Sequence, residues 1–207
     1  MIIGHLGITA ALGTVLRAPI RTARLIALCA AAFAPDVVDG LLVLVGECNP
    51  VGLYSHTIPV VALEAAIVGG LALLLTNSRA TAALFATLVV LHPVGDFFTG
   101  SKLLWPAGDL HGLNLYDRPM IDFLLESSLA VGGWWLIRRA TLAPRWAVSK
   151  WTLAAFLVAQ GLLDLYADSY ARGIKPNRCD AAVSTLVMRG QRRQLSGSHE
   201  SSVMSHE

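Results

Sequence analysis

The sequence contains few charged residues, since Asp, Glu, Lys and Arg make up only 14% of its 207 residues. A soluble domain usually carries about 25% charged residues, whereas here 55% of the residues are hydrophobic. The mean hydropathy is +0.59. This composition predicts an all-α, polytopic helical membrane protein in contact with the lipid bilayer. The formal net charge of +2 is also too small to indicate a nucleic-acid partner.

Cysteine and the common catalytic motifs are scarce or missing as well. The three cysteines, Cys29, Cys48 and Cys179, leave one unpaired, and no C-x-x-C occurs, which argues against a disulfide framework and a thiolate zinc site. The sequence has no G-x-S-x-G, phosphate loop or H-E-x-x-H. It therefore lacks the motifs of serine hydrolases, nucleotide-binding proteins and zincins. No basic residue precedes Arg17, so the N-terminus does not resemble a cleaved signal peptide.

What the sequence does contain is a series of apolar runs, which predict five or six transmembrane helices. The runs begin near residues 4, 25, 59, 80, 120 and 151; the first is short, and Pro35 interrupts the second. From Lys175 onward the chain is polar and rich in serine. We therefore expect a helical membrane domain over residues 1–174 and a disordered tail over residues 175–207.

The distribution of basic residues predicts the orientation in a bacterial plasma membrane. The loops at 17–24, 77–79 and 138–150 contain eight Lys and Arg residues, whereas those at 46–57 and 99–119 contain two. Basic loops favour the cytoplasmic side, so the two poorly charged loops should face outward. The basic residues of the tail run against this alternation, which leaves the side of the tail open.

This topology brings the acidic residues of the spans to one side of the membrane, together with three histidines. The residues concerned are Asp36, Asp39, Glu64, Asp96, Asp122, Glu126, Asp164 and Asp168, with His5, His56 and His92. Acidic residues contribute little to orientation, so sorting alone does not explain their position. A polar cavity that opens to the outer face does.

His92 and Asp96 follow the longest apolar run, Ala80 to Leu91. Four residues apart on a helix, their side chains share one face. An imidazole and a carboxylate in an apolar segment are costly unless they are paired or bind a ligand, so they are either a structural pair or metal ligands. Pro93 between them should kink or end the helix, and it either turns His92 inward or breaks the helical spacing.

Six residues together supply the ligand types of a zinc or manganese site. They are His5, Asp36, Asp39, His56, His92 and Asp96. Imidazole suits zinc, and carboxylates bind and bridge hard cations without help from thiolates. Glu64, Asp122 and Glu126 are weaker candidates; water at the membrane surface can satisfy Asp122 and Glu126. His111, in a predicted loop, should be exposed.

The same residues stand in short motifs whose order is characteristic. The motifs are Gly4-His5, Pro35-Asp36 with Asp39, Ser55-His56, and His92-x-x-x-Asp96 followed by Leu104-Trp105-Pro106. Over residues 4–106 the chain resembles the bacterial family of LexA-regulated, membrane-bound proteins classed as metal-dependent hydrolases. Residues 112–133 are more similar to a looser set of bacterial integral membrane proteins that share these motifs.

Two of the motifs depart from the family pattern. The family has Pro-Asp-x-Asp-His, where this chain reads Pro35-Asp36-Val37-Val38-Asp39-Gly40. The family's His-Arg-Gly-x-Thr-His-Ser is reduced to Tyr54-Ser55-His56-Thr57. Two potential metal ligands of the family are therefore missing.

Resemblance and ligand types together predict a metal-dependent hydrolase of a phosphoester or ester, with a lipid or lipid-linked compound as substrate. Asp39, the carboxylate expected to stay uncoordinated, would act as general base. The alternative is a non-catalytic membrane protein whose acidic residues line a cation or solute pathway, although a transporter would place them near the midplane. Haem between His56 and His92 is a weaker alternative, because the nearby carboxylates favour a hard cation.

Overall fold

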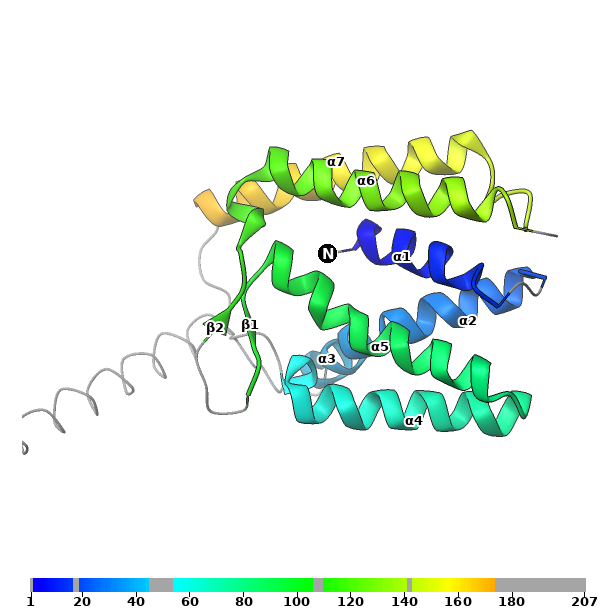
Figure 1. The fold of residues 1–207 in the computed structure, drawn as a ribbon. Coiled ribbons are helices and arrows are strands. Elements are labelled where there is room, and N and C mark those ends of the chain that lie inside the picture. Colours follow the sequence, from blue (N-terminus) through cyan, green and yellow to red (C-terminus); the bar gives the residue numbers. More distant parts are fainter. Residues whose placement is uncertain (1, 17–18, 45–53, 106–109, 141–142, 174–207) are drawn as a thin grey trace, which may run out of the picture.

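The computed structural model describes residues 2–16, 19–44, 54–105, 110–140 and 143–173. These residues form a bundle of helices with a two-stranded hairpin at one end (Figure 1). The helices are α1 (Ile3–Gly13), α2 (Thr22–Ala32), α3 (Ala34–Leu44), α4 (Ile58–Thr76), α5 (Arg79–Thr99), α6 (Pro119–Ile137) and α7 (Lys150–Gly173). Two 3₁₀ turns, η1 (Tyr54–His56) and η2 (Leu115–Asp117), and strands β1 (Lys102–Leu103) and β2 (Leu110–His111) complete them. The predicted tail, 175–207, lies outside the described residues.

The helices are those of a polytopic membrane protein, as predicted, but with fewer clear spans. Within the described residues α4, α5 and α6 are long and apolar enough to cross a membrane, and α2 with α3 makes a fourth if the bent pair counts as one span. The predicted number of five or six is not confirmed. Helix α1 has only 11 residues, and α7, although 24 residues long, interrupts its apolar sequence with Gln160 and Asp164.

The break between α2 and α3 follows from Pro35 and aims the acids of α3 across the bundle. The two helices meet at an angle of 61° around Phe33. Pro35 lies in the first turn of α3, where its missing N–H costs no helical hydrogen bond. Asp36 and Asp39 therefore begin a new helix in a new direction instead of continuing α2.

Helix α5 continues through Pro93, so the four-residue spacing of His92 and Asp96 is helical. One buried face of this helix runs through Leu84, Leu88, His92, Asp96 and Thr99. The first two pack with Leu28, Ala31 and Ala32 of α2 in an apolar cluster. The face thus changes from apolar to polar at His92, near the end of the helix.

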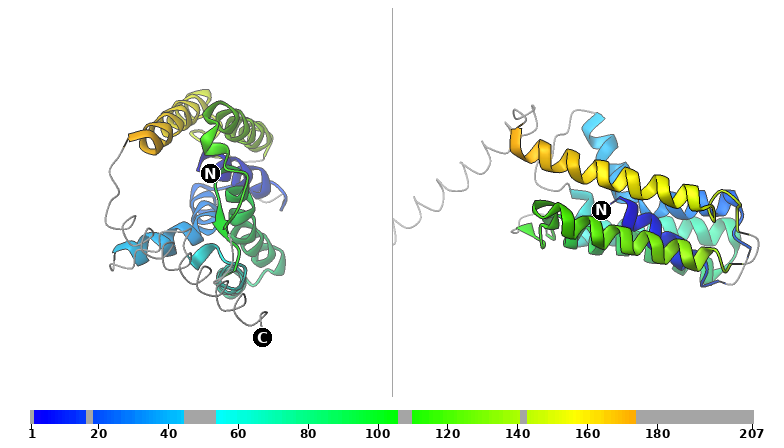
Figure 2. Two further views of the ribbon diagram at one scale, coloured as in Figure 1. Left: turned by 90° about the vertical axis from the view of Figure 1, so that its left-hand side faces the viewer. Right: turned by 90° about the horizontal axis from the view of Figure 1, so that it is seen from above.

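Helix α6 has the reverse order along its buried face, which runs through Asp122, Glu126, Ala130, Gly133 and Ile137. Its apolar part packs closely on α1, because a Cβ atom at Gly133 would lie 2.1 Å from the carbonyl oxygen of Gly7. Glycine is therefore required for this helix crossing. Figures 1 and 2 show α1 between α5 and the α6–α7 pair.

The polar parts of these faces lie at the same end of the bundle. Helices α1, α4 and α6 begin at the hairpin end, and α5 and α7 end there (Figure 1). His5, Asp96 and Asp122 consequently share that end, as the sequence predicted for one side of the membrane.

Candidate metal centre

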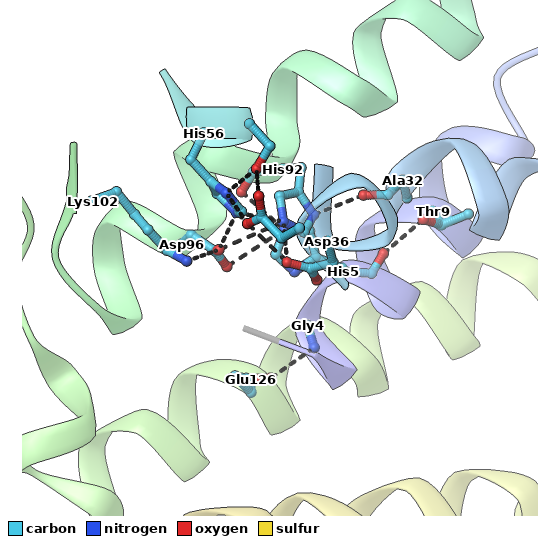
Figure 3. Close-up of polar contacts among 12 residues, drawn as sticks. Gly4, His5, Thr9, Ala32, Asp36, His56, His92, Asp96, Lys102 and Glu126 are labelled. Carbon is cyan, nitrogen blue, oxygen red and sulfur yellow. Dashed lines mark hydrogen bonds and ion pairs between the residues drawn. The ribbon is translucent and has the colours of Figure 1, made fainter. Parts of the chain in front are cut away.

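Four of the six predicted ligands converge in one group, which we call the His/Asp cluster: Asp36, His56, His92 and Asp96 (Figure 3). Each residue offers one ligand atom, and these four atoms lie within 4.8 Å of one another. They come from α3, η1 and α5, so three separate parts of the chain meet here. His56, His92 and Asp96 are buried at 1%, 0% and 4% exposure.

The distances within the His/Asp cluster fit a metal ion. His92 Nε2 lies 3.2 Å from Asp36 Oδ1 and 3.5 Å from Asp96 Oδ2. His56 Nε2 lies 3.6 Å and 3.0 Å from the same two oxygens, and 3.1 Å from His92 Nε2. Ligands ~2.0–2.2 Å from a tetrahedral zinc ion lie about 3.3–3.6 Å apart. The donor set, two imidazoles and two carboxylates, also suits such an ion.

A hydrogen bond to the end of α2 orients the His92 ring. His92 Nδ1 lies 2.7 Å from the carbonyl oxygen of Ala32, the last residue of that helix. Terminal carbonyls of a helix have no partner within the helix and accept from elsewhere. A proton on Nδ1 leaves Nε2, the atom that faces the His/Asp cluster, free to bind a metal.

Asp39 orients His56 in the same way. His56 Nδ1 lies 3.1 Å from Asp39 Oδ2, and its Nε2 faces the His/Asp cluster. The Ser55 hydroxyl donates to the other oxygen of Asp39 and lies 2.9 Å from His56 Nδ1. A carboxylate behind a histidine is the usual arrangement around protein-bound metals. Asp39 therefore lies behind the ring instead of among the four converging atoms.

These contacts also set the charge state of His56. Burial alone lowers the pKa of His56, but its hydrogen bonds to Asp39 and Asp96 outweigh burial and hold that pKa above its ordinary value. Without a metal the imidazole is therefore more readily protonated. Because a metal and a proton compete for the same nitrogen, metal binding here should release a proton and weaken as the pH falls.

His5 supports the His/Asp cluster from α1. Its ring stacks on that of His92, with 4.1 Å between the centroids, and its Nε2 lies 2.9 Å from the His92 carbonyl oxygen. Asp96 Oδ1 is 4.0 Å from the same nitrogen. His5 thus contacts the predicted site but does not belong to the four converging residues.

Lys102 contacts the His/Asp cluster, although no pattern in the sequence indicates this. Its Nζ lies 3.0 Å from Asp96 Oδ2, and its side chain is 20% exposed. The hairpin positions it, since Lys102 pairs with His111 across β1 and β2. In the sequence Lys102 is one basic residue in a loop, and only the hairpin turns it back towards α5.

The site is open on two sides. Asp36 is the exposed member of the His/Asp cluster, with 43% of its side chain accessible. Beside His56 lies a cavity of about 490 Å³. Its other walls are apolar side chains of α4, α5 and Leu104, among them Val90, Val94 and Phe98, which also face outward. His56 therefore lies between the solvent-accessible carboxylate of Asp36 and an apolar cavity.

The other predicted acids whose side chains the structure describes do not join the His/Asp cluster; the side chain of Asp168 lies outside the described part. Glu64 is buried on α4 and interacts electrostatically with His56 and Asp39, but it has no hydrogen-bond partner among the described residues. Asp122, Glu126 and Asp164 lie with Gln160 between α6 and α7. His111 is exposed, as expected.

Fold and site together define a multi-pass helical membrane protein with a buried His/Asp cluster at metal-binding distances. A family model described as "YdjM inner membrane protein" matches residues 1–170. The chain belongs to this family, which confirms the resemblance seen in the sequence motifs and the location in the bacterial inner membrane. No curated protein and no solved structure matched the chain.

Proposed function

We propose that the protein is a metal-dependent hydrolase of the inner membrane, acting on a phosphoester or ester of a lipid or lipid-linked compound. The observation that carries this proposal is the convergence of two imidazole nitrogens and two carboxylate oxygens within 4.8 Å, with each nitrogen 3.0–3.6 Å from the other nitrogen and from both oxygens. Such a set holds zinc or manganese. A divalent ion supplies Lewis acidity, which polarises a phosphoryl or carbonyl oxygen and makes water acidic near neutral pH.

Asp36, His56, His92 and Asp96 would hold the metal in this proposal. His5, also predicted as a ligand, would instead support the His92 ring through stacking. Asp39 was predicted as a ligand and general base, but its contact with His56 Nδ1 favours a role in positioning that ring. Asp36, the accessible carboxylate, would offer one oxygen to the metal, and its second oxygen is better placed to accept a proton from water.

Lys102 and the apolar cavity support an amphipathic substrate. The ammonium group of Lys102 is partly exposed beside Asp96, where it would attract an anionic substrate group. The cavity beside His56 is bounded by apolar side chains that face outward from α4 and α5. An acyl chain in that cavity would bring its head group to the His/Asp cluster.

Metal analysis of the protein, purified without chelator and resupplied with zinc and manganese, tests the proposal. Wild-type protein should bind one divalent ion, and His92→Ala or Asp96→Ala should remove most of it. His111→Ala, an exposed histidine on β2, is the matched control and should retain the metal. Wild-type protein without stoichiometric metal would rule out the site and the hydrolase with it.

A double-mutant cycle separates metal ligands from a structural pair. If His92 and Asp96 only pair with each other, either single change leaves a buried group unpaired at a cost of about 1–3 kcal/mol, and the double change is milder than the sum. If they hold a metal, either single change already abolishes binding. The double change then adds little to the loss of metal and gives no recovery.

Hydrolysis should be measured on phosphomonoesters, phosphodiesters and carboxyl esters, each in a soluble and a micellar form. Lys102→Met should raise KM about tenfold for anionic substrates, because a charged hydrogen bond is worth about 1.5–3 kcal/mol. Metal content should stay unchanged. An unchanged KM would remove Lys102 from the site but leave the metal centre untouched.

The alternative, a cation or solute pathway, differs in where its acids should lie. In the structure the buried acids gather at the hairpin end instead of extending along the helices, which favours a local site. The alternative would be favoured if the metal-loaded protein hydrolysed none of the ester classes and produced a metal-dependent cation flux in vesicles.

We also propose five or six spans with the hairpin end facing outward. Helix α7 packs along α6 and would add one crossing to the four. His111→Cys and Thr76→Cys, in a cysteine-free background, lie at opposite ends of the bundle. An impermeant thiol reagent should label His111→Cys from outside and Thr76→Cys only after the cytoplasmic face is opened. The reverse pattern would invert the topology.

A further inference from the structure

A second group of buried polar residues lies between α6 and α7, away from the His/Asp cluster. We call it the carboxyl cluster: Asp122, Glu126, Gln160 and Asp164. These four side chains are 0%, 1%, 1% and 5% exposed. Glu126, Gln160 and Asp164 line a cavity of about 160 Å³ together with Tyr116 and Tyr166.

The carboxyl cluster contains acceptor atoms without donors. Asp122 and Asp164 face each other across the helix pair. Neither oxygen of Asp122 has a hydrogen-bond partner among the described residues, and the same holds for Asp164 Oδ2 and Gln160 Oε1. Gln160 Nε2 donates to Asp164 Oδ1 at 2.7 Å, which fixes the amide next to that carboxylate. Four buried oxygens are thus left with unused lone pairs.

Lysine and arginine side chains do not explain this arrangement. Within the described part of the chain, no Lys or Arg side chain forms an ion pair with Asp122, Glu126 or Asp164. Glu126 accepts from the backbone N–H of Gly4 at 3.0 Å and so has a partner of its own (Figure 3). Facing carboxylates in an apolar bundle repel each other unless a cation or a shared proton lies between them.

We propose that the carboxyl cluster binds a hard divalent cation, with calcium as the fitting size. Asp122, Asp164 and the Gln160 amide oxygen would be its protein ligands. Carboxylate and amide oxygens without imidazole are the ligand set of calcium and magnesium rather than zinc. The cavity has room for the waters that complete such a coordination sphere, each occupying about 30 Å³.

This site is independent of the proposed hydrolase, and α1 is one of the elements that join the two. Gly4 contacts Glu126 and the adjacent His5 stacks on His92, so one turn of helix connects the two clusters. A bound cation between α6 and α7 would hold this pair together next to α1. Its effect should therefore be seen in stability as well as in ion binding.

Calcium titration of detergent-purified protein tests the proposal with two readouts. The first is the midpoint of thermal unfolding, and the second is luminescence of Tb³⁺, a calcium substitute excited through Tyr116 and Tyr166. Calcium should raise the midpoint of wild-type protein and displace Tb³⁺. Asp122→Asn and Asp164→Asn keep the side-chain size and should each weaken binding at least ~10-fold, since a direct ligand is lost.

Two variants serve as controls. Glu64→Gln neutralises a carboxylate on α4 that is also buried without a hydrogen-bond partner but interacts with His56 and Asp39 instead of the carboxyl cluster, and it should respond to calcium like wild type. His92→Ala should lose zinc and keep the calcium response, which separates this site from the His/Asp cluster. Should one Asn variant fail to fold, the other and Gln160→Leu carry the test.

Equal calcium affinity in wild type and in the folded variants would overturn the proposal. So would wild-type protein that is stabilised by acid but not by calcium or magnesium, since a proton shared by Asp122 and Asp164 would then take the place of the cation.

Discussion

Two buried clusters stand at the same end of this bundle, and they differ in what surrounds their carboxylates. In the His/Asp cluster, Asp96 lies 3.0 Å from His56 Nε2 and 3.0 Å from Lys102 Nζ. In the carboxyl cluster, Asp122 has no hydrogen-bond donor among the described residues. Both side chains are nearly inaccessible, at 4% and 0% exposure. The same residue type is therefore held in opposite electrostatic settings.

The difference shows how each cluster depends on its ligand. In the His/Asp cluster, Ala32 and Asp39 accept hydrogen bonds from the outer ring nitrogens, and Ser55 donates to Asp39, so the geometry of the cluster is supported even without a metal. Among the described residues, the carboxyl cluster has the amide of Gln160 as donor to Asp164 and the backbone N–H of Gly4 as donor to Glu126. A supported site can accept a metal with little rearrangement, whereas an unsupported one gains more stability from the ion it binds.

Neutralising the two aspartates should give the largest contrast. Asp96→Asn removes the partner of Lys102 and His56 and should cost about 3–5 kcal/mol of unfolding free energy. Asp122→Asn removes an unpaired charge, so in metal-free buffer it should leave stability unchanged or raise it. Denaturant titration in detergent, with chelator present, measures both. Equal losses in the two variants would mean that Asp122 has a stabilising partner after all.

The close contact between α1 and α6 can be disrupted by adding a single methyl group. Gly133→Ala would place a Cβ 2.1 Å from the Gly7 carbonyl oxygen, and overpacking of this kind costs about 1–3 kcal/mol. Because α1 carries both Gly4 and His5, zinc and calcium binding should both weaken.

Gly132→Ala is the matched control for this experiment. A Cβ at Gly132 meets nothing within 4 Å, so this variant should unfold like wild type. If Gly133→Ala were equally harmless, the close crossing of α1 and α6 would not be needed for either cluster.

Asp39→Asn tests the support behind His56 and should have the smallest effect of the three. The amide keeps the size of the carboxylate but no longer favours a proton on His56 Nδ1, so zinc affinity should fall about 10–100-fold. Competition with a fluorescent zinc chelator measures the change, with Asp117→Asn, an exposed carboxylate on η2, as control. Complete loss of metal would instead indicate that Asp39 is itself a ligand.

Much of the His/Asp cluster was predictable because its residues stand at helical spacing in apolar sequence. His92 and Asp96 share a face of α5, as predicted. The sequence left open whether Pro93 breaks the helical spacing, and in the structure the helix continues through it. Lys102 and the Ala32 carbonyl were not predictable. A backbone carbonyl carries no residue signal, and Lys102 reaches Asp96 only through the turn of the hairpin.

The carboxyl cluster was harder to predict for a physical reason. Asp122 and Glu126 stand near the start of a span, where water can satisfy a carboxylate, so the sequence favours an exposed interface. Packing of α7 against α6 excludes that water and adds Gln160 and Asp164 from more than thirty positions later in the chain. Only this contact turns two interfacial acids into a buried group.

The sequence by itself determined the membrane class, the helical character of the apolar runs and the family, because hydropathy and short motifs are local properties. It also determined that the acids of the spans lie towards one end of the bundle. The tertiary structure decided which of them meet. The bend at Phe33 aims Asp36 at α5, the same bend leaves the Ala32 carbonyl for His92, and α1 lies between the two clusters. These are relations between segments far apart in the chain, and they depend on packing angles that residue spacing does not encode.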